Sequence, residues 1–366
     1  MKIDYLIVGA GFFGATCARL LHDAGKSVLV VERNNYIGGH AATETKDEIV
    51  IHRFGPHVFH TNNTNIWNFV NKFGTFNQYQ LKVKVNYKDR LYSFPINLLT
   101  LSQVFGVTTP AAALEAIQND IVPNTDPANF EEAALANVGK TLYEIFYKGY
   151  TTKQWGQDPK QLPKTIFNRL PIRLNHDDGY FLKHRCQYQG IPIDGYTPLI
   201  ENMLKGIPVL LNTDVLGNKD SWKTQCQQMI YSGPIDAFFD YEYGKLEYRS
   251  LKFEIEKHDI NDYQGSAVIN YTDINVPYTR ITEHKHFNWQ EKPYTYISKE
   301  YPADYNETNE PYYPVNSLEN AHKLQQYLGL VDQTSNVLFG GRLGTYRYMD
   351  MDETIEAAMK LVKDLI

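Results

Sequence analysis

The apolar and polar positions at the start of the chain follow a strand–helix–strand pattern. Residues 3–8 (IDYLIV) form an apolar run that is typical of a buried strand in a parallel sheet. A glycine loop at 9–14 follows, and residues 15–24 have a helical pattern that ends at a glycine. Residues 27–31 (SVLVV) predict a second strand, which ends at Glu32. This βαβ pattern predicts a Rossmann-like α/β domain with a parallel sheet.

Three later regions have different patterns. Between residues 98 and 165 the apolar positions recur with helical spacing, and few strand-forming residues separate them. From 247 to 298 apolar and polar residues alternate in segments rich in Tyr, Val and Ile, which predicts antiparallel sheet. The tail from Asn336 predicts a short strand, a glycine-arginine turn and a helix from Asp352 to Ile366. We find no flexible linker between these regions, so we expect interleaved domains, with the tail returning to the first one.

Composition and charge exclude several classes of protein. The chain has 366 residues, with 36 Lys and Arg against 42 Asp and Glu, and hence a net charge of −6. Because nucleic-acid phosphates require a basic face, we expect no nucleic-acid partner. No apolar run approaches the roughly 18 residues of a membrane span, so we expect no membrane insertion. Three scattered cysteines and an N-terminus without a cleavage signal predict a cytoplasmic protein in a reducing compartment.

The glycine loop after the first strand has the G-x-G-x-x-G spacing of a dinucleotide site. Gly9 permits the tight turn, Gly11 lets the backbone approach a pyrophosphate, and Gly14 lets helix and strand pack closely. The helix N-terminus supplies free amides for the phosphates. Glu32 follows Gly14 by 18 residues and is placed to accept hydrogen bonds from ribose hydroxyls, which disfavours a 2′-phosphate. The alternative is a glycine turn of an α/β fold that binds no ligand.

Two further glycine segments indicate FAD rather than a nicotinamide cofactor. Glu32 and Arg33 are followed after four residues by Gly38-Gly39, which is similar to the second glycine motif of amine-oxidase-like FAD proteins. A glycine pair there lets the backbone pass close to the same dinucleotide. Near the C-terminus, the segment 339–342 (FGGR) resembles the late FAD-contacting segment of that group, in which an arginine neutralises the pyrophosphate. We therefore expect FAD as the cofactor.

Seven more segments, spread over the chain, form a specific signature. They are GPHVFHT (55–61), KGYTTKQWG (148–156), RLPIR (169–173), LEYRSLKFE (246–254), VPYTRITEHKHF (276–287), EPYYPVN (310–316) and GGRLGTYRYMDMD (340–352). With these segments the chain strongly resembles the bacterial UDP-galactopyranose mutases over essentially its whole length. The resemblance implies a Rossmann-like FAD-binding domain with an inserted helical domain and a six-stranded antiparallel β-sheet domain.

The resemblance also implies domain limits and a reaction. We expect 1–78, 190–238 and 330–366 in the FAD domain, 97–168 in the helical domain with a mobile loop at its end, and 79–96 with 239–329 in the sheet domain. The family are isomerases (intramolecular transferases) that interconvert UDP-galactopyranose and UDP-galactofuranose without net redox change. The chemistry implied is a covalent adduct between the sugar and N5 of the reduced flavin, so FAD is active when reduced. We further expect a homodimer whose product serves cell-surface polysaccharide biosynthesis.

The resemblance implies catalytic and binding roles for the residues of this chain that match the family motifs. The catalytic set comprises Arg169 on the mobile loop, Arg280, His57 and His60. The residues expected to bind UDP-galactose are Phe146, Tyr150, Thr151, Trp155, Tyr180, Asn270, Tyr313, Tyr348 and Asp350. The residues expected to bind the cofactor are Gly9, Gly11, Phe13, Gly14, Glu32, Arg33, Gly39, His57, Arg249, Arg342 and Tyr348. Arginine suits a diphosphate because its planar fork donates two parallel hydrogen bonds.

Several of these positions also have an ordinary structural interpretation. Arg173 is better interpreted as structural, and Arg249 is balanced between a flavin contact and a strand position. His57 and His60 have the spacing of metal ligands, but no Cys or carboxylate pattern supports zinc, so we expect no metal. Trp155 is alternatively a core residue.

Three other functions stay open. The first is the same chemistry on UDP-N-acetylgalactosamine, which depends on the region around His60 and on 81–83 (LKV), where the chain departs from the galactose enzymes. The second is an amine-oxidase-like flavin oxidoreductase, which shares the glycine motifs but does not need phosphate-binding arginines elsewhere. The third is a nucleotide-sugar binding protein without catalysis, which the complete cofactor motifs disfavour.

Overall fold

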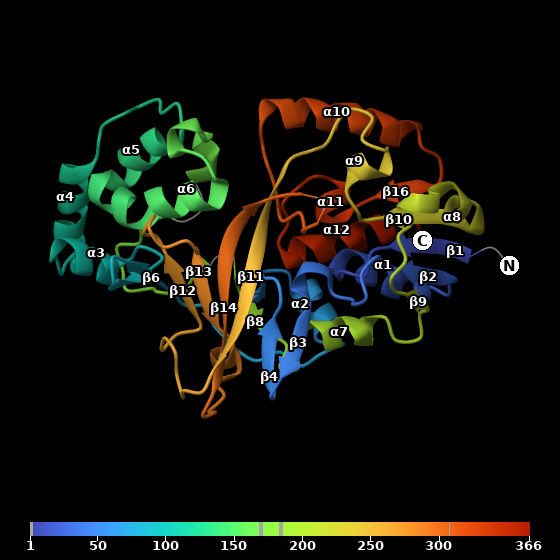
Figure 1. Ribbon diagram of the computed structural model, residues 1–366, viewed down its shortest axis with the longest axis horizontal. Helices are drawn as coiled ribbons and strands as arrows, with labels where there is room; N and C mark the ends of the chain where they lie inside the picture. Colours follow the sequence, from blue (N-terminus) through green and yellow to red (C-terminus); the bar gives the residue numbers. More distant parts are fainter. Residues whose placement is uncertain (1–2, 168–170, 183–185, 307) are drawn as a thin grey trace. The chain divides into compact units, whose positions relative to one another are not determined.

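A computed structural model describes residues 3–167, 171–182, 186–306 and 308–366 (Figure 1). Contacts divide the chain into two compact units, each assembled from separate segments. Unit 1 comprises Met1–Gln78, His184–Arg249 and Tyr305–Ile366, and unit 2 comprises Tyr79–Lys183 and Ser250–Asp304. Within the described ranges, no helix is both long enough and apolar enough to cross a bilayer.

Unit 1 is built on a parallel sheet of the kind that the N-terminal pattern predicts. Its order is β16-β10-β1-β2-β9, and each neighbouring pair is parallel. The strands are β1 (Ile3–Val8), β2 (Val28–Val31), β9 (Val209–Leu210), β10 (Cys226–Tyr231) and β16 (Val337–Phe339). Leu6 lies between Leu29 and Met229 in this register, and Leu6 and Met229 are fully buried. The tail strand therefore returns to the first domain, as its pattern predicts.

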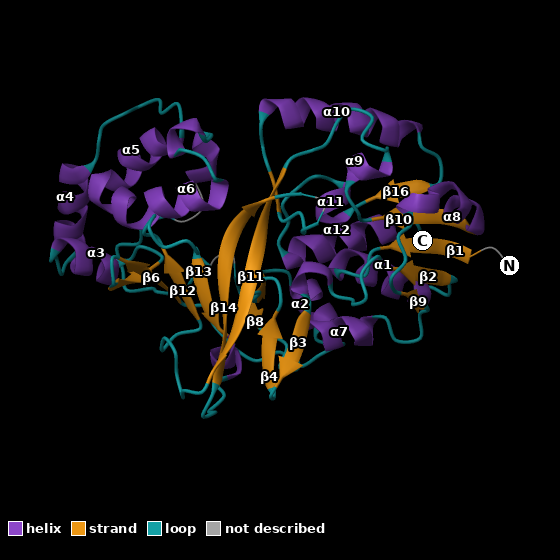
Figure 2. Cartoon of the chain, in the orientation of Figure 1, coloured by secondary structure: helices purple, strands orange, loops and turns teal. Residues whose placement is uncertain are grey.

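The helices of unit 1 are short apart from three. They are α1 (Phe12–Asp23), α2 (Thr64–Val70), α7 (Tyr196–Met203), α8 (Lys219–Gln225), α9 (Ile235–Phe238), α10 (Leu318–Gln333), α11 (Gly341–Gly344) and α12 (Met351–Lys363), with 3₁₀ turns at Gly39–Ala41 and Leu216–Asn218. Figure 2 shows α1 and α8 beside the parallel strands. Helix α1 begins three residues before the predicted start, because the second half of the glycine loop already has helical geometry. Two small sheets pair β3 (Thr43–Lys46) with β4 (Ile49–His52) and β5 (Phe59–Thr61) with β8 (Tyr188–Gly190).

Unit 2 combines helices with strands of a mixed sheet. Its strands are β6 (Val83–Tyr87), β7 (Arg90–Phe94), β12 (Val268–Tyr271), β13 (Arg280–Glu283), β14 (Thr295–Asp304) and most of β11 (Tyr248–His258). Its helices are α3 (Leu98–Phe105), α4 (Pro110–Asp120), α5 (Phe130–Leu142) and α6 (Gly149–Trp155), with a π-helix at Tyr143–Lys148 and 3₁₀ turns at Pro159–Gln161, Lys164–Phe167 and His284–Asn288. The predicted all-antiparallel, six-stranded sheet is wrong in detail: β6 and β12 are parallel, and the sheet has seven strands in the described ranges. The seventh is β15 (Tyr313–Pro314), which pairs with the first residues of β11 in unit 1.

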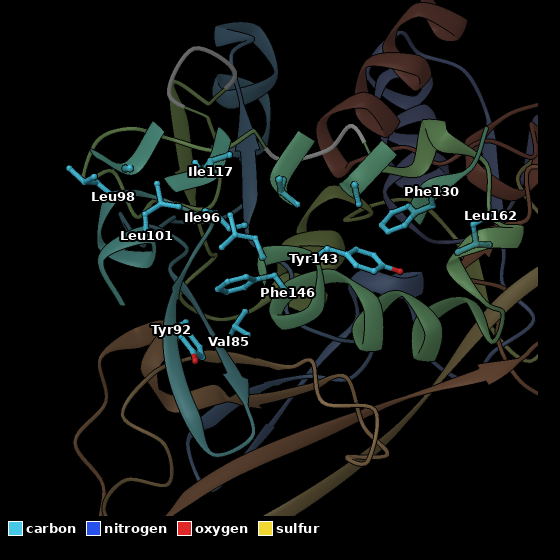
Figure 3. Packing of buried hydrophobic residues seen from close by; sticks show 14 residues of the cluster. Val85, Tyr92, Ile96, Leu98, Leu101, Ile117, Phe130, Tyr143, Phe146 and Leu162 are labelled. Carbon is cyan, nitrogen blue, oxygen red and sulfur yellow. The ribbon is translucent and has the colours of Figure 1, made fainter. Parts of the chain in front are cut away.

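The limits of the two units differ from the predicted domains in two ways. Residues 239–249 and 305–329, which we expected in the sheet domain, belong to unit 1. The physical reason is a core in unit 1 in which Leu246, Tyr248 and Tyr327 pack with Ile235 and Tyr346. The contacts also place the helical region and the sheet together in unit 2, because one hydrophobic core joins them (Figure 3). The division into three domains stays a prediction.

Candidate functional site

A large pocket opens in unit 1 around the glycine loop. Its empty volume, including the open mouth, is about 1280 Å³. Predicted cofactor residues that line it are Gly9, Gly11, Phe13, Glu32, Arg33, Gly39, His57 and Arg342. The pocket follows the carboxyl ends of β1, β2 and β10, where ligands of open parallel sheets bind. The arrangement suits a dinucleotide.

Backbone conformation explains two glycines of this pocket, Gly9 and Gly39. Gly9 has a φ of +102°, and a side chain there would overlap the hydroxyl of Ser232. Gly39 also has a positive φ, of +54°, and it lies beside Gly11: a Cβ on Gly39 would be in ordinary van der Waals contact, at 3.4 Å, with the Cα of Gly11. Helix α1 starts at this point with no acidic residue in its first turn and no side chain bonded to its first amides. Its amide end therefore suits an anion such as a pyrophosphate.

Glu32 is fixed by two backbone amides at the edge of the pocket. Its Oε2 accepts a hydrogen bond from the Ala10 amide at 2.9 Å, and its Oε1 accepts one from the Asn34 amide at 2.9 Å. The side chain is buried, yet it still lines the pocket. Each carboxylate oxygen has a second lone pair, so hydroxyl groups of a ligand can still donate to it. The two amide bonds hold the carboxylate in one orientation.

A charged group that the sequence reasoning missed also lines the pocket. Glu310 pairs with Arg33, with 2.7 Å between Nη2 and Oε2, and lies 3.7 Å from Nε2 of His40. Burial by itself would raise the pKa of the Glu310 carboxyl, but His40 and Arg33 lower it below its ordinary value. The signal was present in the sequence, because Glu310 begins the EPYYPVN segment. The lining of the pocket therefore contains an ion pair between Glu310 and Arg33.

The turn after β10 supplies other pocket residues that the sequence reasoning missed. Ser232, Gly233 and Pro234 line the pocket directly after the apolar strand. The Ser232 hydroxyl donates to the Val8 carbonyl at 2.7 Å, which ties this turn to the glycine loop. A Ser-Gly-Pro turn that ends an apolar run was the available signal. Only the strand order, with β10 next to β1, brings it to the cofactor loop.

Three predicted cofactor residues are absent from the pocket lining in the described ranges. Gly14 has the packing position that its motif predicts, because a side chain there would overlap the Gly9 carbonyl oxygen. Arg249 is buried in β11, where it lies opposite Tyr313 of β15. Tyr348 packs beneath the guanidinium of Arg342, whose Cζ is 4.3 Å from the ring centroid. A role of Arg249 or Tyr348 toward a cofactor stays a prediction.

Unit 1 also contains the predicted substrate and catalytic residues described next, which lie in pairs or beside the pocket. Tyr313 and Tyr348 stack with 6.1 Å between their ring centroids. His60 Nε2 lies 3.7 Å from Oδ2 of Asp350, and Asp350 caps helix α12 through a capping box with Glu353. His57 lines the pocket, and its Nδ1 lies 2.8 Å from the Gly55 carbonyl oxygen. Because a carbonyl only accepts, Nδ1 carries the proton of the neutral ring, and Nε2 is the acceptor.

A second group of predicted residues surrounds Arg280 in unit 2. The Arg280 Nε donates to Oδ1 of Asn270 at 3.0 Å, and its Nη1 pairs with Oε2 of Glu300 at 2.9 Å. Its Nη2 lies 3.4 Å from the hydroxyl of Tyr150 on α6. Glu300 is 3% exposed, so its carboxylate orients the guanidinium from the buried side. The sequence reasoning missed Glu300, which only the pairing of β13 with β14 brings opposite Arg280.

The other predicted substrate residues of unit 2 differ in exposure. Tyr180 and Trp155 are half-buried, and Trp155 also packs against the hydrophobic core. Thr151 is buried. Phe146 is 4% exposed and lies in the core, with its ring 5.6 Å from that of Tyr92 and stacked 6.1 Å from that of Phe94 (Figure 3). These contacts give Phe146 a packing role, and its ring has almost no surface open to a ligand.

We expect Phe146→Ala to destabilise the fold rather than to weaken ligand binding selectively. Removing a buried aromatic ring typically costs about 3–5 kcal/mol, because it leaves a cavity. Denaturant unfolding measures this change, with Leu99→Ala as the control, since Leu99 is exposed on α3. An unchanged free energy of unfolding together with weaker nucleotide binding would contradict the packing role.

The two arginines of the RLPIR segment have different outcomes. Arg169, the predicted catalytic residue, lies outside the described residues, so its role stays a prediction. Arg173 is buried, and its guanidinium donates to the carbonyls of Asp177 at 3.2 Å, Gly179 at 2.5 Å and Tyr180 at 3.2 Å. These bonds fix the following turn. The structural interpretation of Arg173 is therefore confirmed.

Comparisons with known proteins agree with this arrangement. The model of the UDP-galactopyranose mutase family matches residues 145–348, and that of NAD(P)-binding Rossmann-like domains matches residues 7–73. A probable UDP-galactopyranose mutase of Klebsiella pneumoniae is 42% identical over 371 residues, which cover 99% of this chain and 94% of the relative. The dTDP-fucopyranose mutase of Escherichia coli is also 42% identical, over 377 residues that cover 98% of both chains. The crystal structure of a reduced UDP-galactopyranose mutase has the same fold, with a TM-score of 0.77 at 14% identity over 100% of this chain and 95% of that one.

Proposed function

The chain belongs to the UDP-galactopyranose mutase family and is an isomerase, and from that premise we propose that it interconverts UDP-galactopyranose and UDP-galactofuranose without net redox change. The observation that carries the proposal is the setting of Arg280. Its guanidinium is oriented by Asn270 and Glu300 while Nη2 reaches the hydroxyl of Tyr150. An arginine beside a half-buried tyrosine suits a nucleoside diphosphate, which needs both a cation and an aromatic face.

We propose FAD as the cofactor because the residues of the unit 1 pocket fit it. Gly9, Gly11 and Gly39 line the pocket with bare backbone, and a side chain at Gly9 would overlap the Ser232 hydroxyl. Gly11 and the amide end of α1 would hold the pyrophosphate together with Arg342, and Glu32 would accept from ribose hydroxyls. When bound and reduced, the flavin supplies a nucleophile for the anomeric carbon.

The chain itself supplies position and charge for this reaction. UDP gains negative charge as its bond to the sugar breaks, so a fixed guanidinium at Arg280 stabilises the departing group more than the intact substrate. The same contact would keep UDP in the site until it bonds to the rearranged sugar. We assign a stacking role toward uracil to Tyr150, and roles toward the phosphates to Tyr180, Tyr313 and Tyr348. The proposed role of Arg169 is a second positive charge toward the diphosphate.

The two histidines have separate roles in this proposal. Nε2 of His57 acts as the acceptor, since Nδ1 is held by the Gly55 carbonyl. Nε2 of His60 lies 3.7 Å from Oδ2 of Asp350, close enough for an ion pair when the ring is protonated. We propose that His57 contacts the cofactor and that His60 contacts the sugar.

A second candidate is dTDP-fucopyranose, because the relative of that name is as similar as the UDP-galactopyranose relative. The two reactions have the same class and differ in the base and the sugar. UDP-N-acetylgalactosamine is a third candidate, from the departure at residues 81–83. The cytoplasmic location, the homodimer and the use of the product in cell-surface polysaccharide stay predictions.

A turnover assay tests the proposal. Purified protein is given UDP-galactofuranose with dithionite, beside a sample without reductant, and the products are separated by chromatography. We expect UDP-galactopyranose only in the reduced sample. Parallel reactions with dTDP-fucofuranose and with the N-acetylated sugar distinguish the substrates. Oxygen consumption with an amine, without any sugar conversion, would instead indicate a flavin oxidoreductase.

A further inference from the structure

The side chain of Lys153 on α6 ends at a cluster of four backbone carbonyls. Its Nζ donates to the carbonyl oxygens of Tyr271 at 2.8 Å and of Asp273, Val276 and Tyr278 at 2.9 Å each. An ammonium has three N–H bonds, so it acts toward four oxygens largely as a point charge. All four carbonyls belong to the end of β12 and the connection that follows it, residues 271–279, which we call the β12–β13 connection.

Two more positions on the same helical stretch hold this connection. The Thr272 hydroxyl donates to the Ile145 carbonyl at 2.6 Å. Gly149 passes so close that a side chain there would overlap the Thr272 carbonyl oxygen. Ile145, Gly149 and Lys153 are spaced by four residues, so they lie along one side of the stretch formed by the π-helix and α6. The connection is therefore packed against this side at three levels.

The β12–β13 connection leads directly into the residues around Arg280. Asn270, which accepts from the Arg280 Nε, lies on β12 just before the connection, and Arg280 is the first residue of β13 after it. Tyr150, which Arg280 Nη2 approaches, is on the same helix as Lys153. The ammonium thus ties the helix that carries the tyrosine to the backbone that carries the arginine.

We propose that Lys153 is a positioning residue, whose ammonium gathers the β12–β13 connection against α6 and so sets Arg280 beside Tyr150. The proposal rests on the role of Arg280 toward a nucleoside diphosphate given above. The four hydrogen bonds of the Lys153 ammonium described above all go to backbone oxygens, so we expect its effect on a ligand to pass through Arg280.

Removal of the charge tests this proposal. Lys153→Met keeps an unbranched apolar stem as far as Cε but loses the ammonium and its donors. We expect the affinity for UDP, measured by calorimetry, to fall about tenfold or more, since small displacements of a positioning group cost this much. The melting temperature and the bound flavin are measured beside it. Lys160→Met is the matched control, because that lysine is exposed on the same unit, with its Nζ 3.8 Å from Glu131. UDP affinity within twofold of the parent in Lys153→Met would overturn the proposal.

A double-mutant cycle separates positioning from general stability. If Lys153 acts through Arg280, adding Lys153→Met to Arg280→Ala changes UDP affinity by less than twofold. A general structural effect would instead multiply with the loss from Arg280→Ala, which would overturn the proposal. As a chemical rescue, n-propylammonium should restore UDP affinity to Lys153→Ala. Equal restoration by tetramethylammonium, which has no N–H, would assign the effect to ionic strength and count against the proposal.

A second variant keeps the test decisive if Lys153→Met does not fold. Gly149→Ala pushes the same connection away from the helix while Lys153 remains, and we expect a similar loss of UDP affinity that also disappears in the Arg280→Ala background. Retained affinity in Gly149→Ala would count against the proposal. These readouts are binding constants, so they test the role of Lys153 even if the turnover assay shows no conversion. A negative turnover assay would contradict the proposed reaction alone. A parent protein that binds neither UDP nor dTDP would overturn the role of Arg280, and the role of Lys153 with it.

Discussion

Arg280→Ala should lower kcat for UDP-galactofuranose by on the order of 10²–10³-fold at saturating substrate, while the bound flavin is retained. This is the usual loss when a fixed donor is removed from a charge that develops in the transition state. The substitution has a second consequence, since it leaves the carboxylate of Glu300 buried without its partner. An uncompensated buried charge destabilises a fold by about 3–5 kcal/mol.

A companion variant separates the two effects of Arg280→Ala. The double change Arg280→Ala/Glu300→Gln removes the unpaired charge, so we expect it to recover thermal stability but not turnover. Arg90→Ala serves as the control, because Arg90 is exposed on β7 of the same unit. Chromatographic turnover and thermal unfolding are the two measurements. A kcat within twofold of the parent in Arg280→Ala would show that another group stabilises the leaving diphosphate.

Gly14→Ala should yield protein with little or no bound flavin. Its new Cβ would overlap the Gly9 carbonyl oxygen and approach Cγ2 of Ile7 to 3.1 Å. Both contacts are with β1 and the glycine turn that follows it, so helix α1 must move away from the sheet. Its N-terminal amides would then no longer be placed to bind the pyrophosphate. Overpacking of this kind typically costs about 1–3 kcal/mol. The visible absorbance of the purified protein reports the flavin content.

Gly329→Ala provides the matched control for that variant. Gly329 lies within α10, and no atom comes within 4 Å of an added Cβ. The same chemical change should therefore leave flavin binding unchanged and stabilise the helix by up to about 1 kcal/mol. Full flavin content in Gly14→Ala would mean that the close contact of α1 with the glycine turn is not required for the cofactor.

The local elements of unit 1 were predictable because their signals are short in range. The apolar run 3–8, the glycine loop and the run 27–31 each specify one element, and β1, α1 and β2 follow within three residues of the expected bounds. Glycine positions are readable for a similar reason, since a tight turn or a close approach excludes other residues whatever the rest of the fold. Motif matches also led to the family, which the relatives confirm.

Packing over long sequence distances produced the differences. Phe146 lies just before the KGYTTKQWG segment, yet its ring packs into the core against Tyr92 and Phe94 of β7, which are far from it in the sequence. The parallel pairing of β6 with β12 joins strands more than 180 residues apart, and alternation in the sequence does not specify direction. The limits of unit 1 likewise depend on a cluster that joins Leu246 to Tyr327.

The sequence by itself determined the Rossmann-like start with its glycine loop, the family and its class of reaction, because these are encoded in contiguous motifs. Only the tertiary structure decided which charged and backbone groups meet those motifs. Glu300 comes opposite Arg280 through the pairing of β13 with β14. Glu310, which pairs with Arg33, belongs to the last of the three segments that form unit 1. The four carbonyls around Lys153 belong to a separate segment of the chain. A buried charge selects its partners by proximity in space, and the linear sequence does not contain that information.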